Sequence, residues 1–257
     1  MSTINQTRPE AIKLARMLRL DAGEPPEYLL TVPAGELVSY RNSLAELLYD
    51  DEMTLMRRMV DAAPLLPSQM LATVAEKALG PVICARLLGL LAPERAADIA
   101  KHLSVGFVAE TAAELDPRCA VDVVTAMPDD QVVSIALTLA ANREYVAMGR
   151  IVTHLPPGPL ATTIERLSEE QLLRISFVLD DKSQIKRLAE VVGADRVRQI
   201  LAGADALGLA EEAEDLCGHL TAAQRKLFGA PAKPTTSSKP GGRRSSSGRV
   251  SAAPARV

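Results

Sequence analysis

Apolar residues recur along most of the chain at spacings of three and four, which is the pattern of one buried helix face. Between residues 91 and 167 this pattern is broken at short, regular intervals. The first four breaks are 11, 13 and 11 residues apart, and the last two are again 11 apart. Helices of about ten residues, roughly 15 Å long, are therefore predicted. Because such short helices are not stable alone, each must stack on its neighbours, as in a solenoid. The breaks lie at Pro93, Ser104, Pro117, Pro128, Pro157 and Ser168.

The residues at these breaks are suited to begin helices. Pro is tolerated in the first turn, where its missing N–H has no helical partner. Ser and Asp can accept hydrogen bonds from the N–H groups that the first turn leaves unpaired. Ser168 and Gln171 have the spacing of a capping box, in which each side chain bonds to the backbone of the other residue. The pattern thus predicts an all-α protein built from short helical hairpins.

The N-terminal part of the chain carries the same helical periodicity. A helix is predicted from Pro9 to Leu20, with Lys13, Arg16 and Arg19 together on one of its faces. A further helix is predicted over Glu52–Ala63. Between them, one apolar stripe at helical spacing consists of Leu37, Tyr40, Leu44, Leu47 and Leu48.

Composition indicates an aliphatic core and a separate tail. Hydrophobic residues make up 47% of the chain but aromatic residues only 3%, with no Trp. Leu, Val, Ile, Ala and Met must therefore fill the core. From residue 230 onward the chain consists mainly of Ser, Pro, Gly, Ala and Arg, which predicts disorder. We divide the chain into an N-terminal helical region at 1–64, a helical repeat region at 65–229 and a disordered basic tail at 230–257.

Charge is distributed unevenly between these parts. The net charge is −3, but the tail holds six of the 29 basic residues and no acidic ones, which leaves 23 basic and 32 acidic residues in 1–229. An acidic body argues against nucleic acid wrapping around the repeat. The tail segment Lys239–Arg249 has the composition to contact nucleic acid or an acidic lipid surface. A phosphorylation target at its serines, a purely solubilising end and contact with the acidic body of the same chain are the other interpretations.

The histidines and cysteines are few and have no spacing typical of a metal or catalytic site. Two of the histidines precede a Leu near an expected helix C-terminus, where the helix dipole favours a positive side chain. The cysteines are flanked by apolar residues, which is typical of buried thiols in a reducing compartment. The histidines are His102, His154 and His219, and the cysteines are Cys84, Cys119 and Cys217.

Paired acids occur at Asp50–Asp51–Glu52, Asp129–Asp130 and Asp180–Asp181. Each group lies near an expected helix start, where the helix dipole stabilises negative charge, although a continuous helix through the first group is also possible. Magnesium needs only one or two carboxylates plus water, so weak magnesium binding stays open. The chain has no GxxxxGK[ST], GxSxG or HExxH motif. We assign no catalytic, cofactor or metal residue and expect no enzymatic activity.

Membrane insertion and secretion have no support in the sequence. A spanning helix needs about 20 apolar residues, and the most apolar run, Val132–Ala141, has ten. The N-terminus is polar and lacks the apolar core of a signal peptide. A cytoplasmic location is therefore expected.

The phrases LAPERAADIAKHL and ELDPRCAVDVVTAMPDDQVVSIAL resemble the cytoplasmic N domain of MgtE-type magnesium transporters, and more distantly FliG-like helical modules. The resemblance covers about residues 65–200 and implies a right-handed superhelix of short helices. It implies no transport by this chain, which has neither a CBS pair nor transmembrane helices. In that family the N domain contributes acids to regulatory magnesium binding. The nearest acids here are Asp98, Asp129 and Asp130, and we assign no metal site to them.

These observations predict an interaction scaffold or regulatory protein that binds a protein partner through a helical-repeat surface. A magnesium-responsive regulator detached from a transporter is a second hypothesis, which the resemblance and the paired acids motivate. A nucleic-acid-associated factor that uses the basic tail is a third.

Overall fold

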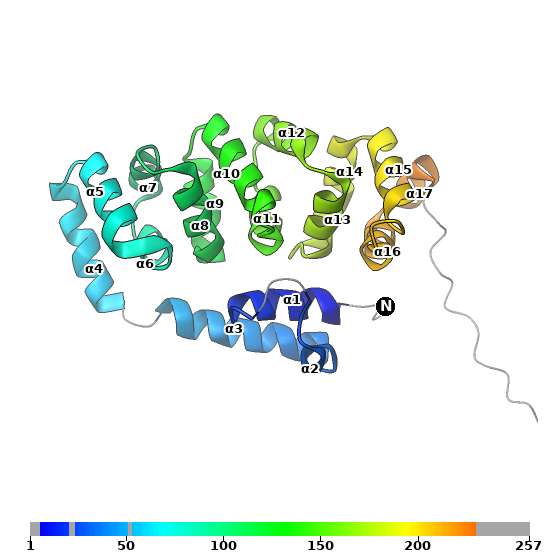
Figure 1. The fold of residues 1–257 in the computed structure, drawn as a ribbon, viewed down its shortest axis with the longest axis horizontal. Helices are drawn as coiled ribbons and strands as arrows, with labels where there is room; N and C mark the ends of the chain where they lie inside the picture. The colour runs from blue at the N-terminus through cyan, green and yellow to red at the C-terminus, as the bar shows by residue number, and fades with distance from the viewer. Residues whose placement is uncertain (1–5, 21–23, 51–52, 230–257) are drawn as a thin grey trace, which may run out of the picture.

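The computed structural model describes residues 6–20, 24–50 and 53–229 (Figure 1). Every regular element in these residues is a helix, which confirms the predicted all-α class. None of the helices described combines the length and the apolar character needed to cross a bilayer. The tail at 230–257 lies outside the described residues. The elements are α1 Thr7–Met17, α2 Glu27–Leu30, α3 Ala34–Asp50, α4 Met53–Ala62, η1 Ala63–Leu65, α5 Ser68–Val74, η2 Ala75–Leu79, α6 Gly80–Leu88, α7 Pro93–Ala100, α8 Val105–Glu114, α9 Pro117–Thr125, α10 Asp129–Ala141, α11 Tyr145–Val152, α12 Pro157–Arg166, α13 Glu169–Phe177, η3 Lys182–Gln184, α14 Ile185–Val192, α15 Ala194–Gly203, α16 Ala210–His219 and α17 Ala222–Phe228.

From α5 onward the helices stack side by side in one continuous row, which forms the upper part of Figure 1. Along the row, helices pack against those two positions later: α5 against α7, α6 against α8, α8 against α10, and α10 against α12. The interior helices of the row thereby have packed neighbours on both sides, which is compatible with the predicted solenoid. The right-handed sense of the superhelix stays a prediction.

The core of the row is aliphatic, as the composition predicts. One buried cluster extends from α7 to α17 and consists of Ala, Val, Leu, Ile and Met side chains together with Phe228. The apolar residue directly before a helix cap is buried at successive junctions, where it fixes the angle at which the chain enters the next helix. This burial explains the Leu-Pro phrasing of the sequence. The buried residues at these positions are Leu115, Met127, Leu155, Leu167 and Leu220.

The predicted breaks lie at helix starts. Ser168 Oγ accepts a hydrogen bond from Gln171 N (3.2 Å), and Gln171 Oε1 accepts one from Ser168 N (2.9 Å), which confirms the capping box. Ser104 Oγ accepts a hydrogen bond from Phe107 N (3.4 Å) at the start of α8. Pro93, Pro117 and Pro157 are the first residues of their helices, and Pro128 is the N-cap of α10.

Polar side chains in the first turn of several helices also tie the row together. Gln131 Nε2 in α10 donates to Ala100 O at the end of α7 (2.8 Å), and Gln171 Nε2 in α13 donates to Ala140 O near the end of α10 (3.2 Å). Carbonyl groups in the last turn have no partner within their own helix. Each of these two carbonyls also accepts a backbone N–H from beyond the helix end, from Leu103 N to Ala100 O (3.2 Å) and from Arg143 N to Ala140 O (3.1 Å). The glutamine side chain therefore adds a second hydrogen bond, which joins the two helices. Arg196 Nη1 in α15 does the same for Ile164 O in α12 (2.7 Å).

Helices α1, α2 and α3 form a small unit that lies along one edge of the row (Figure 1). This unit has its own buried cluster, separate from that of the row. α4 then packs on α6 at the beginning of the row. Asp50 is the last residue of α3, so it ends a helix, and the prediction that it helps to begin one is wrong. Asp51 and Glu52 lie outside the described residues. The buried cluster of the unit contains Ala11, Leu14, Ala15, Leu29 and Leu37.

Candidate interaction surface

The histidines lie apart from one another at helix ends. His102 follows α7 and His154 follows α11, as the sequence predicts, and His219 is the last residue of α16. His219 Nδ1 lies 2.8 Å from Asp215 O and 3.6 Å from Asp215 Oδ1. Across the part of the chain that the structure describes, no group of three or more His, Cys, Asp or Glu side chains is placed to hold a metal ion.

The paired acids of the repeat have different surroundings. Asp129–Asp130 lies in the first turn of α10, as predicted. Asp181 is the N-cap of η3, where its carboxylate accepts a hydrogen bond from Ser183 N (3.0 Å). Hydrogen bonds from the side chains of Ser183 and Gln184 hold the pKa of Asp181 below its ordinary value. Asp180, one residue earlier, faces α1 and belongs to the surface described below.

Asp98 is engaged by its own neighbours. Ser68 Oγ donates a hydrogen bond to Asp98 Oδ2. Arg95 Nη1 lies 3.5 Å from the same oxygen, and Lys101 Nζ lies 3.8 Å from Asp98 Oδ1. The Ser68 hydrogen bond, followed by the two cations, lowers the pKa of Asp98. These contacts already compensate its charge.

Two of the three cysteines are buried as predicted. Burial raises the pKa of Cys84 to about 11 and also raises the pKa of Cys217. Cys119 is half-buried, and its Sγ lies 3.7 Å from Gly89 O. Because a thiolate rather than a thiol is the nucleophile, a raised pKa makes Cys84 and Cys217 unreactive near neutral pH.

The row presents an acidic edge to α1. In Figure 1, α1 lies along the side of the row, and its contacts run from α16 at its beginning to α8 at its end. The acids come from four positions far apart in the sequence, and the stacking of the helices brings them into one line. We define the acidic edge as the carboxylates of Glu114, Glu144, Asp180, Glu211 and Glu212.

Basic side chains of α1 meet these carboxylates one after another. Each contact is at hydrogen-bond distance, and such charge-assisted bonds are shorter and stronger than neutral ones. α1 is therefore bound along its whole length. The contacts are Arg8 Nη1 to Glu211 Oε2 (2.7 Å) and Glu212 Oε1 (3.1 Å), Lys13 Nζ to Asp180 Oδ1 (2.8 Å), Arg16 Nε to Glu144 Oε2 (2.7 Å), Arg16 Nη2 to Glu114 Oε1 (3.0 Å) and Arg19 Nη2 to Glu114 Oε2 (3.1 Å).

Lys13 is the most buried cation of this interface, at 2% exposure. Its Nζ donates to Glu10 Oε1 (2.8 Å), to Asp180 Oδ1 (2.8 Å) and to Leu179 O (3.4 Å). Arg41 from α3 lies 3.3 Å from Glu10 Oε2 and 3.5 Å from Asp180 Oδ1. Burial acts to raise the pKa of Asp180, but the Lys13 and Arg41 cations outweigh it, and the pKa lies below its ordinary value.

An aromatic ring lies beneath the charged contacts. Phe177, at the end of α13, is 1% exposed, and Ile12 of α1 packs on the cluster that it forms with Val146. The Arg8 guanidinium carbon and Lys182 Nζ each lie 5.4 Å from the ring centroid, within the range of cation–π attraction. Ile12 is thus the apolar anchor of α1 on the row.

The spacing of these α1 residues explains why they share one face. Arg8, Ile12 and Arg16 follow one another at steps of four, which is one stripe of a helix. Arg19 reaches Glu114 from the turn after α1, where its φ is 55°. The sequence placed Lys13, Arg16 and Arg19 together but missed Arg8, because the helix was predicted to begin at Pro9. Extending the stripe by one turn would have found Arg8. Nothing in the sequence identified the acidic residues that this face of α1 contacts.

A cavity lies at the contact between α1 and the row. Its volume is about 130 Å³, and it lies beside Arg16, where α1 passes the α10–α11 junction. Arg143 lines it and has a φ of 61°, a left-handed conformation that lets Glu144 N donate to Leu139 O (2.9 Å) and end α10. Tyr145 also lines this cavity, and burial raises its pKa.

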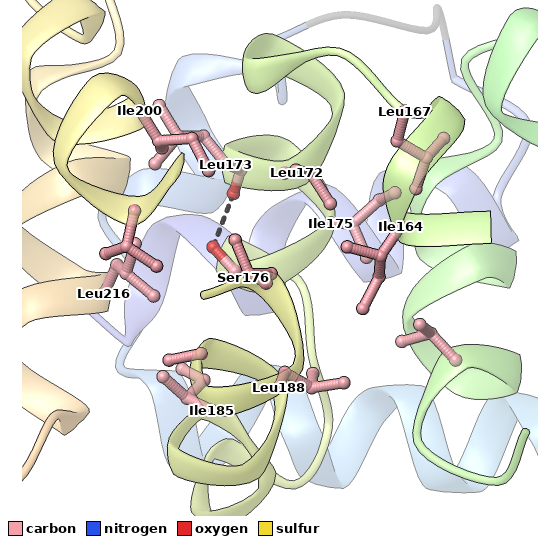
Figure 2. A pocket seen from close by; sticks show the side chains of 14 residues that line it. Ile164, Leu167, Leu172, Leu173, Ile175, Ser176, Ile185, Leu188, Ile200 and Leu216 are labelled. Atoms are coloured by element: carbon pink, nitrogen blue, oxygen red, sulfur yellow. Dashed lines mark hydrogen bonds between the residues drawn. The ribbon is translucent and has the colours of Figure 1, made fainter. Parts of the chain in front are cut away.

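Figure 2 shows a second cavity, of about 60 Å³, within the row. Its one polar lining side chain is Ser176, whose Oγ already donates to Leu173 O (2.8 Å). The remaining lining is aliphatic, so no free polar group is present to orient a ligand. We interpret this cavity as imperfect core packing. Side chains around it include Ile164, Leu173, Ile185, Ile200 and Leu216.

Comparison of the chain with protein-family models, with curated proteins and with solved structures finds no match. The resemblance to the N domain of MgtE-type transporters therefore stays a prediction. The function proposed below is argued from the geometry of the acidic edge.

Proposed function

We propose that the protein is a non-enzymatic interaction scaffold that binds a protein partner through the acidic edge of its helical row. The observation that carries this proposal is the seating of α1 across α16, the end of α13, α11 and α8. A surface that holds a helix through an ordered line of charges and one apolar anchor has the properties of a helix-recognition site.

The architecture suits this role because the helical stack sets the spacing of the acids. Glu114 ends α8 and Glu144 is the N-cap of α11, so their positions follow from the packing of those helices. Rigid elements hold recognition groups more accurately than loops do. The excess of acidic residues in 1–229 adds a favourable long-range field for a basic partner.

Site-specific photo-crosslinking in native extract tests the proposal. The full chain would carry a photoreactive amino acid in place of Arg143, which is exposed and lines the cavity beside α1. The matched control replaces Arg166, which is exposed and belongs to α12, a helix at the top of the row in Figure 1, whereas α1 lies below the row. The expected result is a protein captured from position 143 and not from position 166. Equal capture at both positions, or none at either, would contradict the proposal.

The other two hypotheses gain no specific observation. Asp98 is engaged by Ser68, Arg95 and Lys101, and Asp129–Asp130 lies in a helix first turn. A nucleic-acid-associated role rests on residues 230–257, outside the described residues. Following the melting temperature during a magnesium titration tests the magnesium-responsive role. Deleting the tail and measuring retention on DNA or RNA at low salt tests the nucleic-acid-associated role.

A further inference from the structure

We propose that α1 is an internal occupant of the acidic edge, and that a basic amphipathic helix of the partner displaces it. This inference rests on the proposed function, because it names the partner of that edge and the way in which access to it is regulated. It follows from how α1 is attached, from what its departure would leave behind, and from the spacing of its side chains.

The attachment of α1 to the row is mainly electrostatic. Its buried apolar residues, Ala11, Leu14 and Ala15, belong to the cluster that it shares with α2 and α3. Toward the row it contributes Ile12 as an apolar contact, next to a cavity of about 130 Å³. The unit of α1, α2 and α3 can therefore leave the edge without losing its own core. Salt weakens such contacts more than it weakens apolar packing.

Release of α1 from the acidic edge is unfavourable when no other helix takes its place. Glu212 is 2% exposed and pairs with Arg8, whereas the Asp180 side chain, which pairs with Lys13 and Arg41, is 41% exposed. A buried carboxylate that loses its partner costs far more than the pair itself contributes. An incoming helix that supplies the same cations avoids this cost. The edge therefore favours exchange of one basic helix for another over simple release of α1.

The contacts of α1 specify the chemistry of that incoming helix. Counting from the position equivalent to Arg8, an apolar residue is needed four positions later, a cation five positions later and another cation eight positions later, as at Ile12, Lys13 and Arg16. The helix would lie with its N-terminus near α16 and its C-terminus near α8, as α1 does. Arg suits the two terminal positions because its planar fork can bridge two carboxylates.

Fluorescence anisotropy with a labelled helical peptide tests the proposal on the full chain. The peptide is an Ala-rich 20-mer that carries the α1 stripe, and the control peptide has the same composition with its cations moved off the stripe. The protein variants are R8A/R16A, which weakens the internal occupant, and R166A on α12 as a matched control. We expect the stripe peptide to bind R8A/R16A at least tenfold more tightly than wild type and R166A to behave as wild type. Adding E114Q/E144Q to R8A/R16A should reduce the binding at least tenfold, because the peptide then loses carboxylates that Arg16 no longer occupies in that variant. Equal affinities for wild type and R8A/R16A, or equal binding of both peptides, would overturn the proposal.

Hydrogen exchange of the wild-type chain provides a second measurement that needs no variant to fold. Exchange of the α1 amides should rise when the stripe peptide is added and should not change with the control peptide. Unchanged α1 exchange at a saturating peptide concentration would contradict displacement. The two proposals can fail separately. If a protein is crosslinked from position 143 but the peptide does not displace α1, the scaffold proposal stands and the displacement proposal fails. If the peptide displaces α1 but no protein is crosslinked, the scaffold proposal fails and the displacement proposal stands.

Discussion

Replacing Lys13 by Met is the most direct perturbation of the interface between α1 and the row. Met keeps most of the length and apolar character of the side chain but removes its charge. The ammonium group is 2% exposed and donates to Glu10 and Asp180, each at 2.8 Å. The K13M variant therefore leaves two carboxylates that have lost their nearest cation.

The size of the effect follows from what remains around those carboxylates. Removing one partner of a fully buried ion pair costs about 3–5 kcal/mol. The Asp180 side chain is 41% exposed, so water can solvate it again, and Arg41 still lies 3.3 Å from Glu10 and 3.5 Å from Asp180. We therefore expect K13M to lower the free energy of unfolding at pH 7 by about 2 kcal/mol.

The same reasoning fixes the sign of the pH dependence. The pKa of Asp180 is lowered in the folded chain, since the cations outweigh the opposing effect of burial. The stability that its charge contributes is thus present above the ordinary Asp pKa of about 4 and is lost as the pH falls through the lowered value. Because K13M removes the largest of the cationic influences on Asp180, the difference in unfolding free energy between wild type and K13M should shrink on going from pH 7 to pH 3.

Urea unfolding of wild type, K13M, D180N and the double variant at both pH values measures these quantities. K101M is the matched control, because Lys101 is 51% exposed and lies 3.8 Å from Asp98, so no measurable change is expected. The double-mutant cycle should give a coupling of about 1 kcal/mol between Lys13 and Asp180. Two results would contradict this prediction. One is a K13M free energy of unfolding equal to that of K101M, and the other is a loss of unfolding free energy in K13M that is as large at pH 3 as at pH 7.

Three further changes test other parts of the structure by urea or thermal unfolding. S168A removes the N-cap oxygen of α13 and should destabilise the protein by about 1 kcal/mol, whereas S168T should retain most of the stability. V197I adds one methylene toward the cavity of about 60 Å³ in Figure 2 and should stabilise the protein by up to about 1 kcal/mol. A loss of stability would mean that the cavity does not accept the added methylene. R143G relieves the left-handed conformation at φ 61° and should stabilise by about 0.5–1 kcal/mol; a loss would show that the arginine side chain makes a net favourable contact.

How well the sequence predicted the structure differs from one feature to another. The capping box at Ser168 and the helix starts at Pro93 and Pro117 follow from local chemistry, and the structure confirms them. Asp50 was misassigned because an acid beside a break is equally compatible with the end of one helix and the start of the next. Gln171 was predicted as a cap alone, yet its Nε2 also bonds to Ala140 O in α10, a contact that depends on stacking.

The sequence by itself determined the helical class, the aliphatic core and the places where helices begin, because periodicity and capping act over a few neighbouring residues. It also placed Lys13 and Arg16 of α1 on a common face with Arg19, although it missed Arg8. Only the tertiary structure decided what that face meets. Glu114 and Glu212 are 98 residues apart along the chain, and both come to α1 because successive short helices stack side by side in one row. That stacking arises from packing across the whole row, and no local pattern encodes it.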